Sequence, residues 1–119
     1  MKIDREVRNT VLAAPGESRL SFVLDWSLGS TLEAAADLAS RKDRRDAIRR
    51  AVAAVKSPVL AALEAQPSVE VSDVEGSGHT VVAASADQWR ALLDHPVIRE
   101  AAGRILPNAL FTEDRGGEP

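Results

Sequence analysis

The chain has 119 residues, a length that suits one domain with a single modest hydrophobic core. Its formal net charge of -3 argues against a dedicated nucleic-acid surface, and the absence of cysteine excludes disulfides, thiolate chemistry and cysteine zinc sites. Neither a secretory signal nor the roughly 20 consecutive apolar residues of a membrane span occurs in the sequence. We therefore expect a cytoplasmic protein without nucleic-acid or membrane partners.

The first segment, residues 1–18, is a short mixed stretch that contains Pro15-Gly16, a dipeptide typical of turns. We expect it to form a loosely held N-terminal arm. Within this arm, Thr10 to Ala14 could pair at the edge of a sheet.

The stretch from Arg19 to Leu28 alternates between apolar and mixed positions, which predicts a strand with one buried face. The buried side consists of Leu20, Phe22, Leu24 and Trp26. Ser21, Val23 and Asp25 point to the other side. We expect Val23 to lie on a sheet face that is open to a partner.

A helical region follows between residues 30 and 66. Ser30 to Glu33 has the pattern of a capping box, and Arg41 to Asp46 is a charged tract whose interleaved carboxylates favour a solvated helix face. Apolar residues at helical spacing then form one stripe: Ile48, Val52, Val55, Val59 and Leu63. Because Ser57-Pro58 interrupts this stripe, we expect two or three helical pieces in the place of one crossover helix.

A hairpin and a helix come next. Val69 to Val74 and Thr80 to Ala84 predict two strands around the turn Glu75 to Gly78, with a bulge near Ser72-Asp73 because Val74 is out of phase. Ser85 and Gln88 then form a capping box. The helix that this box begins carries Trp89, Leu92 and Leu93 on one face.

The chain ends less regularly. Asp94-His95-Pro96 either ends the preceding helix or begins a new one that runs to Gly103. Ile105 to Phe111 is the remaining apolar run, and Pro107 within it favours an edge strand or an irregular segment. We expect residues 112–119, which are acidic and rich in glycine, to form a flexible tail.

The predicted order of elements is βαββαβ, which indicates an α+β ferredoxin-like two-layer sandwich over residues 19–111. Its sheet is expected to be antiparallel, with the helices on one face and the other face bare. Trp26 and Trp89 are interpreted as core anchors, because they are the bulkiest side chains in a chain with only 3% aromatic residues. Phe22, Leu92 and Leu93 should meet them beneath the helices.

The sequence offers little support for catalysis. His79 and His95 are the two histidines, and neither has the spacing to a second ligand that a metal site needs. Gly76-Ser77-Gly78 lacks the surroundings of a phosphate-binding loop, and no nucleophile elbow is present. We therefore expect a protein that is not an enzyme and uses no cofactor or metal; a small enzyme is the weakest alternative.

Residues 19–106 resemble the propeptide, or inhibitor, domain of subtilisin-like serine proteases. The resemblance rests on three stretches: the alternating strand RLSFVLDW, the charged helix DRRDAIRRAVAAVKSPVLAALEAQ followed by VEVSDV, and the later VVAASADQWRALLDHPVI. It implies a ferredoxin-like fold whose bare sheet face sits on two surface helices of a protease. It also implies a C-terminal extension that lies in the active-site cleft, so that the domain inhibits the protease and assists its folding.

The chain departs from this family pattern at two places. Arg99 to Arg104 is a polar insertion before the last predicted strand, and no protease domain follows Pro119 in the sequence given. The expected function is therefore that of a standalone protein that binds and inhibits, or assists folding of, a subtilisin-like protease in trans. The alternative is a non-inhibitory interaction or adaptor module of the same fold. The oligomeric state stays open.

General physical arguments select the residues that would contact a partner protein. Val23 belongs to the bare sheet face, and Asp73 and Glu75 could cap helix N-termini of the partner, where a negative charge is favoured. The tail beyond residue 109 could add as a strand in a cleft. Its predicted contacts are Leu110, Phe111, Thr112 and Glu113, of which the first two are apolar anchors.

Overall fold

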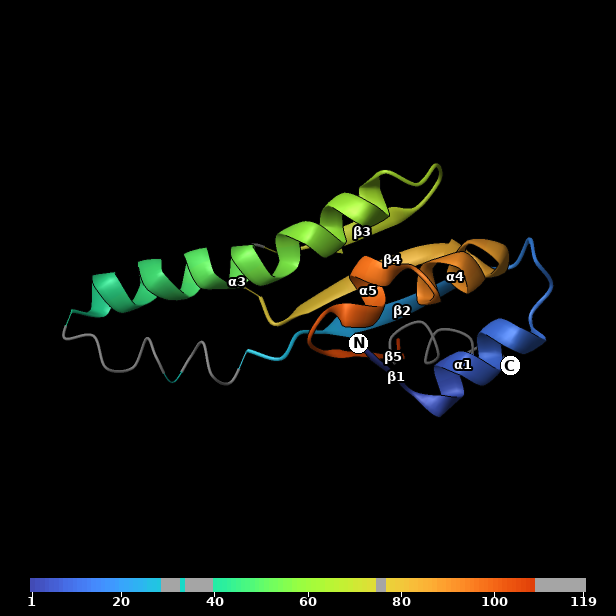
Figure 1. The fold of residues 1–119 in the computed structure, drawn as a ribbon, viewed down its shortest axis with the longest axis horizontal. Coiled ribbons are helices and arrows are strands. Elements are labelled where there is room, and N and C mark those ends of the chain that lie inside the picture. The colour runs from blue at the N-terminus through green and yellow to red at the C-terminus, as the bar shows by residue number, and fades with distance from the viewer. Residues whose placement is uncertain (29–32, 34–39, 75–76, 109–119) are drawn as a thin grey trace, which may run out of the picture.

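The computed structural model describes residues 1–28, 33, 40–74 and 77–108. In this part of the chain the protein is an α+β fold with one five-stranded mixed sheet and four helices (Figure 1). The elements in chain order are β1 (Lys2–Ile3), α1 (Arg5–Ala13), β2 (Arg19–Asp25), α3 (Arg41–Glu64), β3 (Glu70–Asp73), β4 (His79–Ser85), α4 (Ala86–Leu93), α5 (Pro96–Glu100) and β5 (Arg104–Pro107).

The sheet has the strand order β1-β5-β2-β4-β3. The pairs β5-β2, β2-β4 and β4-β3 are antiparallel, whereas β1 pairs with β5 in parallel. The sheet is therefore mixed, and the expectation of a purely antiparallel sheet is wrong. The parallel pair is made by β1, a strand that was not predicted, which places the start of the chain alongside the last strand.

The predicted strand and hairpin form the centre of the sheet. Leu20, Phe22 and Leu24 of β2 are buried, and Trp26 just after the strand is 3% exposed, as the alternation predicts. The register of β3 and β4 runs from Glu70 opposite Ala83 to Asp73 opposite Thr80 without an extra residue, so the bulge expected near Ser72-Asp73 is wrong. Val74 explains the phase error, because it lies beyond β3 and is largely exposed.

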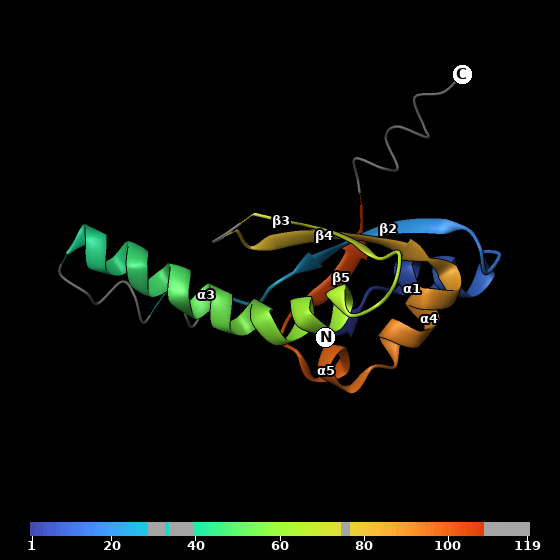
Figure 2. The same ribbon diagram turned by 90° about the horizontal axis from the view of Figure 1, so that it is seen from above.

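All four helices lie on the same side of the sheet (Figure 2). The Ser85–Gln88 capping box that begins α4 is present in full: Gln88 N donates to Ser85 Oγ, and Ser85 N donates to Gln88 Oε1. This start directs Trp89 onto the sheet, where its ring meets Phe22 edge-to-face at a centroid distance of 5.0 Å. The predicted core is confirmed, because Leu92 and Leu93 belong to the same buried cluster.

Helix α3 runs without interruption from Arg41 to Glu64, so the expected break at Ser57-Pro58 is wrong within this range. Pro58 cannot donate to the carbonyl of Ala54, but both residues are exposed and water can replace the lost bond. Only the C-terminal half of α3 is buried against the sheet, beginning at Val52. The charged first half extends past the sheet (Figures 1 and 2). The earlier capping-box helix, predicted from Ser30, lies largely outside the described residues.

The N-terminal segment 1–18, expected as a loosely held arm, supplies a strand and a helix. Val7 and Val11 of α1 are 0% and 1% exposed, and the helix packs against α4 and β5. Residues 10–13 belong to α1, so the expected edge pairing of Thr10 to Ala14 is wrong. The C-terminal end of α1 is also bonded to α4, because the Arg90 side chain donates to the carbonyls of Val11 and Ala14.

The last strand is also placed differently from the prediction. β5 lies between β1 and β2, so it is an internal strand although it contains Pro107. On this side of β5, β1 pairs only with Arg104 and Ile105. Pro107 lies beyond the end of β1, so no β1 carbonyl lacks a donor because proline has no amide hydrogen. Before β5, His95 begins the short helix α5 by accepting at Nδ1 from Val97 N. No helix in the described residues is long and apolar enough to cross a membrane.

Candidate functional site

The candidate functional site is the sheet face opposite the helices, which no described helix covers (Figure 2). Side chains alternate along strands, so the positions between the buried residues of β2 and β4 all point to this face. The strand register aligns these positions into one row across β3, β4, β2 and β5. This central row consists of Ser72, Val81, Val23 and Leu106, and its three apolar members are partly exposed.

A charged row borders the central row on one side. The register places Asp25 between His79 and Arg104. Arg104 Nη2 lies 3.2 Å from Asp25 Oδ2, and His79 Nε2 lies 3.4 Å from Asp25 Oδ1. The two basic side chains are more than half exposed, whereas the carboxylate is 27% exposed. This border therefore offers the Arg104 guanidinium, the His79 ring and one partly covered carboxylate to a partner.

A polar row borders the other side. Ala83 lies opposite Glu70 of β3 and Ser21 of β2. Glu70 Oε1 is 3.0 Å from Arg19 Nη2, and Asn108 Nδ2 donates to Ser21 Oγ at 3.0 Å. The face therefore has an apolar centre with polar margins on both sides, which is the arrangement of a typical protein-binding patch.

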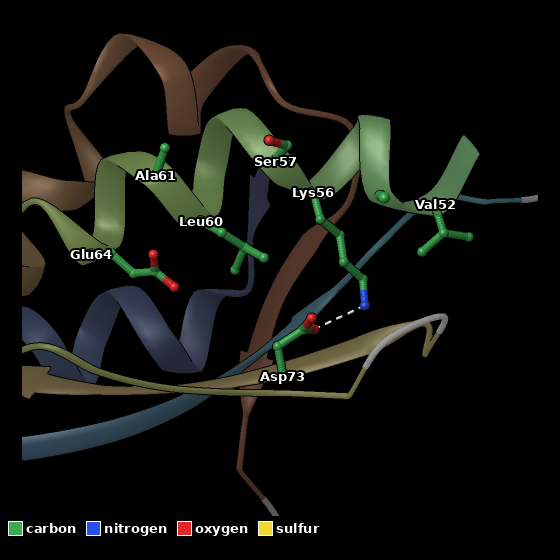
Figure 3. Close-up of a pocket in the computed structure, with 8 residues that line it drawn as sticks. Val52, Lys56, Ser57, Leu60, Ala61, Glu64 and Asp73 are labelled. Atoms are coloured by element: carbon green, nitrogen blue, oxygen red, sulfur yellow. Dashed lines mark hydrogen bonds and ion pairs between the residues drawn. The ribbon is translucent and has the colours of Figure 1, made fainter. Parts of the chain in front are cut away.

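Asp73, which was predicted to contact a partner, lies on the opposite side of the sheet. It pairs with the buried Thr80 and points toward α3 (Figure 3). Lys56 Nζ lies 2.9 Å from Asp73 Oδ1 and also donates to the carbonyl of Val74 at 3.4 Å. The main chain of Asp73 is exposed at the sheet edge, but its side chain is only 21% exposed.

A chain of side-chain hydrogen bonds continues from Asp73 into the core. Thr80 Oγ1 donates to Asp73 Oδ1 at 2.5 Å and accepts from Trp26 Nε1 at 2.9 Å. Each side chain of this hydrogen-bond network has a partner: the buried Lys56 ammonium is paired with the Asp73 carboxylate, and the Trp26 indole N–H donates to Thr80. The network fastens α3 to the β3-β4 hairpin and to the end of β2. Its role in the fold is structural.

The predicted partner-binding residues therefore separate into three groups. Val23 lies in the central row of the open face, and its contact with a partner stays a prediction. Asp73 is engaged internally on the helix side, so these two residues cannot contact one partner surface together. Glu75 and the four tail residues Leu110, Phe111, Thr112 and Glu113 lie outside the described residues.

Sequence reasoning missed Lys56, although a signal was present. Val52, Lys56, Val59 and Leu63 follow one another at steps of four, three and four residues, which places the lysine on the buried face of the helix. The predicted apolar stripe runs through Val55 instead, and Val55 is only partly buried. A lysine within an apolar helical stripe should have indicated a buried carboxylate partner.

The remaining polar candidates have structural roles in the described part of the chain. His95 caps α5, and Trp26 and Trp89 are both core residues whose indole N–H groups donate to Thr80 Oγ1 and the Leu20 carbonyl. Within the described part of the chain, no three histidine or carboxylate side chains converge to form a metal site.

Comparisons with known proteins leave the family of this chain open. No protein-family model, no curated protein and no solved structure matches it. The functional assignment therefore depends on the residues and geometry of the sheet faces.

Proposed function

We propose that the protein binds another protein through the open face of its sheet, and that this partner is a subtilisin-like serine protease. On this proposal the protein inhibits the protease, or assists its folding, as a separate chain and has no catalytic activity of its own. One observation carries the proposal: Val81, Val23 and Leu106 form a partly exposed apolar row with polar margins on a sheet face that the described helices leave bare.

The connectivity gives the proposal further support. The strands β5-β2-β4-β3 are antiparallel neighbours, α3 follows β2, and α4 precedes β5. We propose that these elements form a ferredoxin-like βαββαβ unit, to which β1, α1 and α5 are additions. Such a unit presents one sheet face to its helices and the other to a partner.

A second candidate is an adaptor that binds a protein other than a protease. It is favoured by the position of Asp73, whose carboxylate is held by Lys56 and Thr80 and is not free to cap a helix of the partner. The protease proposal consequently rests on the open face and on the tail, and not on the hairpin carboxylate.

The experiment is to mix the purified chain with a panel of subtilisin-like proteases and to measure both complex formation and residual proteolysis. Inhibition that is lost in Val23→Glu supports the proposal, because a buried carboxylate in the apolar row is costly to desolvate. Leu12→Glu, which changes an exposed apolar residue on α1, is the matched control and should inhibit normally. Binding to a protein without inhibition of any protease would select the adaptor; equal inhibition by both variants would exclude the open face.

A further inference from the structure

The outer edge of the sheet at β3 is free within the described part of the chain. β3 is the last strand in the sheet order and pairs only with β4. In an antiparallel edge strand, every second residue directs both its N–H and its C=O away from the sheet. Glu70, Ser72 and Asp73 are exposed, and no described strand lies beyond β3 to pair with its outward main-chain groups.

Helix α3 lines a pocket of about 340 Å³ beside this edge. The pocket is bounded by Asp73 on the strand and by Val52, Ala53, Lys56, Ser57, Leu60, Ala61 and Glu64 on the helix. Figure 3 shows Leu60 and Glu64 directed from α3 toward the space above the strand. A further strand beside β3 would lie about 4.8 Å away, with alternate side chains directed to the same side as the helices.

The charges of β3 itself do not oppose an added strand. Charged side chains on an edge strand commonly prevent pairing. Here, however, Glu70 lies 3.0 Å from Arg19 and Asp73 lies 2.9 Å from Lys56, so each carboxylate already has a cation partner within the chain. Glu64 is the exception in this region, because its exposed carboxylate has no cation partner among the described residues.

We propose that this edge binds an extended peptide segment of a partner protein, which adds to β3 as an antiparallel or parallel strand. The main-chain groups of β3 would supply hydrogen bonds, and the pocket would take one or two medium-sized apolar side chains. The free Glu64 carboxylate selects a lysine or arginine near one end of the segment. This site is separate from the open face and does not rest on the function proposed for that face.

The first test uses a panel of fluorescein-labelled peptides with alternating valine and threonine that end in lysine, glutamine or glutamate. We expect the lysine-ended peptide to bind the full chain, and Ala53→Arg to weaken this binding at least tenfold by filling the pocket. Ala54→Arg places the same side chain one position further along the same helix, on an exposed residue that does not line the pocket, and should bind like the wild type. Equal affinity in the two variants, or no binding by any peptide, overturns the proposal.

The second test concerns charge and location. Glu64→Lys should reverse the preference, so that the glutamate-ended peptide binds more tightly than the lysine-ended one, whereas Glu100→Lys on α5 should preserve the original order. Amide NMR shifts on peptide addition should concentrate at residues 70–73, and Val23→Glu should not change them. Concentration-dependent dimerisation that Ala53→Arg abolishes would instead identify a second copy of the chain as the occupant, against this proposal.

Discussion

The two faces of the sheet are built from neighbouring residues of the same strands and yet differ in burial. Leu20, Phe22 and Leu24 are buried under helices, whereas Ser21, Val23 and Asp25, each one residue later, remain partly exposed. Phe22 contacts the ring of Trp89, whereas Val23 lies beside Val81 and Leu106 in the central row of the open face. We therefore expect mutations one position apart to alter stability and binding separately.

Trp89→Ala should have the largest effect on the covered face. It removes the largest fully buried side chain, leaves a cavity beside Phe22 and deprives the buried Leu20 carbonyl of its donor. We expect a loss of about 3 to 5 kcal/mol in the free energy of unfolding, measured by urea denaturation. Leu12→Ala, at a position 67% exposed, should cost less than about 0.5 kcal/mol. Similar losses in the two variants would contradict the assignment of Trp89 to the core.

Gly103→Ala tests the close contact between the residue before β5 and the end of β2. Gly103 has φ +129°, and an added Cβ would lie 2.5 Å from the carbonyl oxygen of Asp25. We expect a loss of about 2 to 3 kcal/mol in the free energy of unfolding from backbone strain and displacement. Ala102→Gly, at the exposed neighbouring position, is the control and should lose less than about 1 kcal/mol. A wild-type melting temperature in Gly103→Ala would show that this loop can adopt another conformation at little cost.

Lys56→Met tests the polar network between α3 and the hairpin. Methionine keeps the packing of the lysine stem but leaves Asp73 without its cation. Because the Asp73 side chain is 21% exposed and keeps its bond from Thr80, we expect a moderate loss of about 1 to 2 kcal/mol. The double variant Lys56→Met with Asp73→Asn should recover part of this loss. If Lys56→Met alone were neutral, the ion pair would contribute nothing to the stability of the hairpin.

Val23→Glu should have the smallest effect on stability and the largest on partner binding. The open face lets the new carboxylate remain in water, so we expect a change of less than about 0.5 kcal/mol in the free energy of unfolding. Inhibition of a cognate protease should nevertheless fall at least tenfold. A strongly destabilised variant would mean that the described face is covered in the folded protein.

Deletion of residues 112–119 tests a contribution to binding from outside the sheet. We expect an unchanged melting temperature and weaker inhibition, because the tail would contribute main-chain bonds in the cleft of the protease. If the shortened chain inhibited the protease fully, the tail would have no role in inhibition and the open face alone would bind.

Much of the covered face could be predicted because its signals are local. The alternation of β2, the reciprocal Ser85–Gln88 cap and the spacing of Trp89, Leu92 and Leu93 all appear as expected. The partner-binding set was predicted less well. Val23 lies on the open face, but alternation alone did not reveal that Asp73, in register with Thr80, points the other way.

Which side chains share a face follows from the sequence, because a strand or helix period depends only on neighbours within a few residues. The tertiary structure alone decided which distant segments meet: β1 beside β5, α1 against α4, and Lys56 beside Asp73. It also decided that α3 continues through Pro58, because the unmade hydrogen bond faces solvent. These outcomes depend on pairing and burial across the whole chain, for which local spacing carries no information.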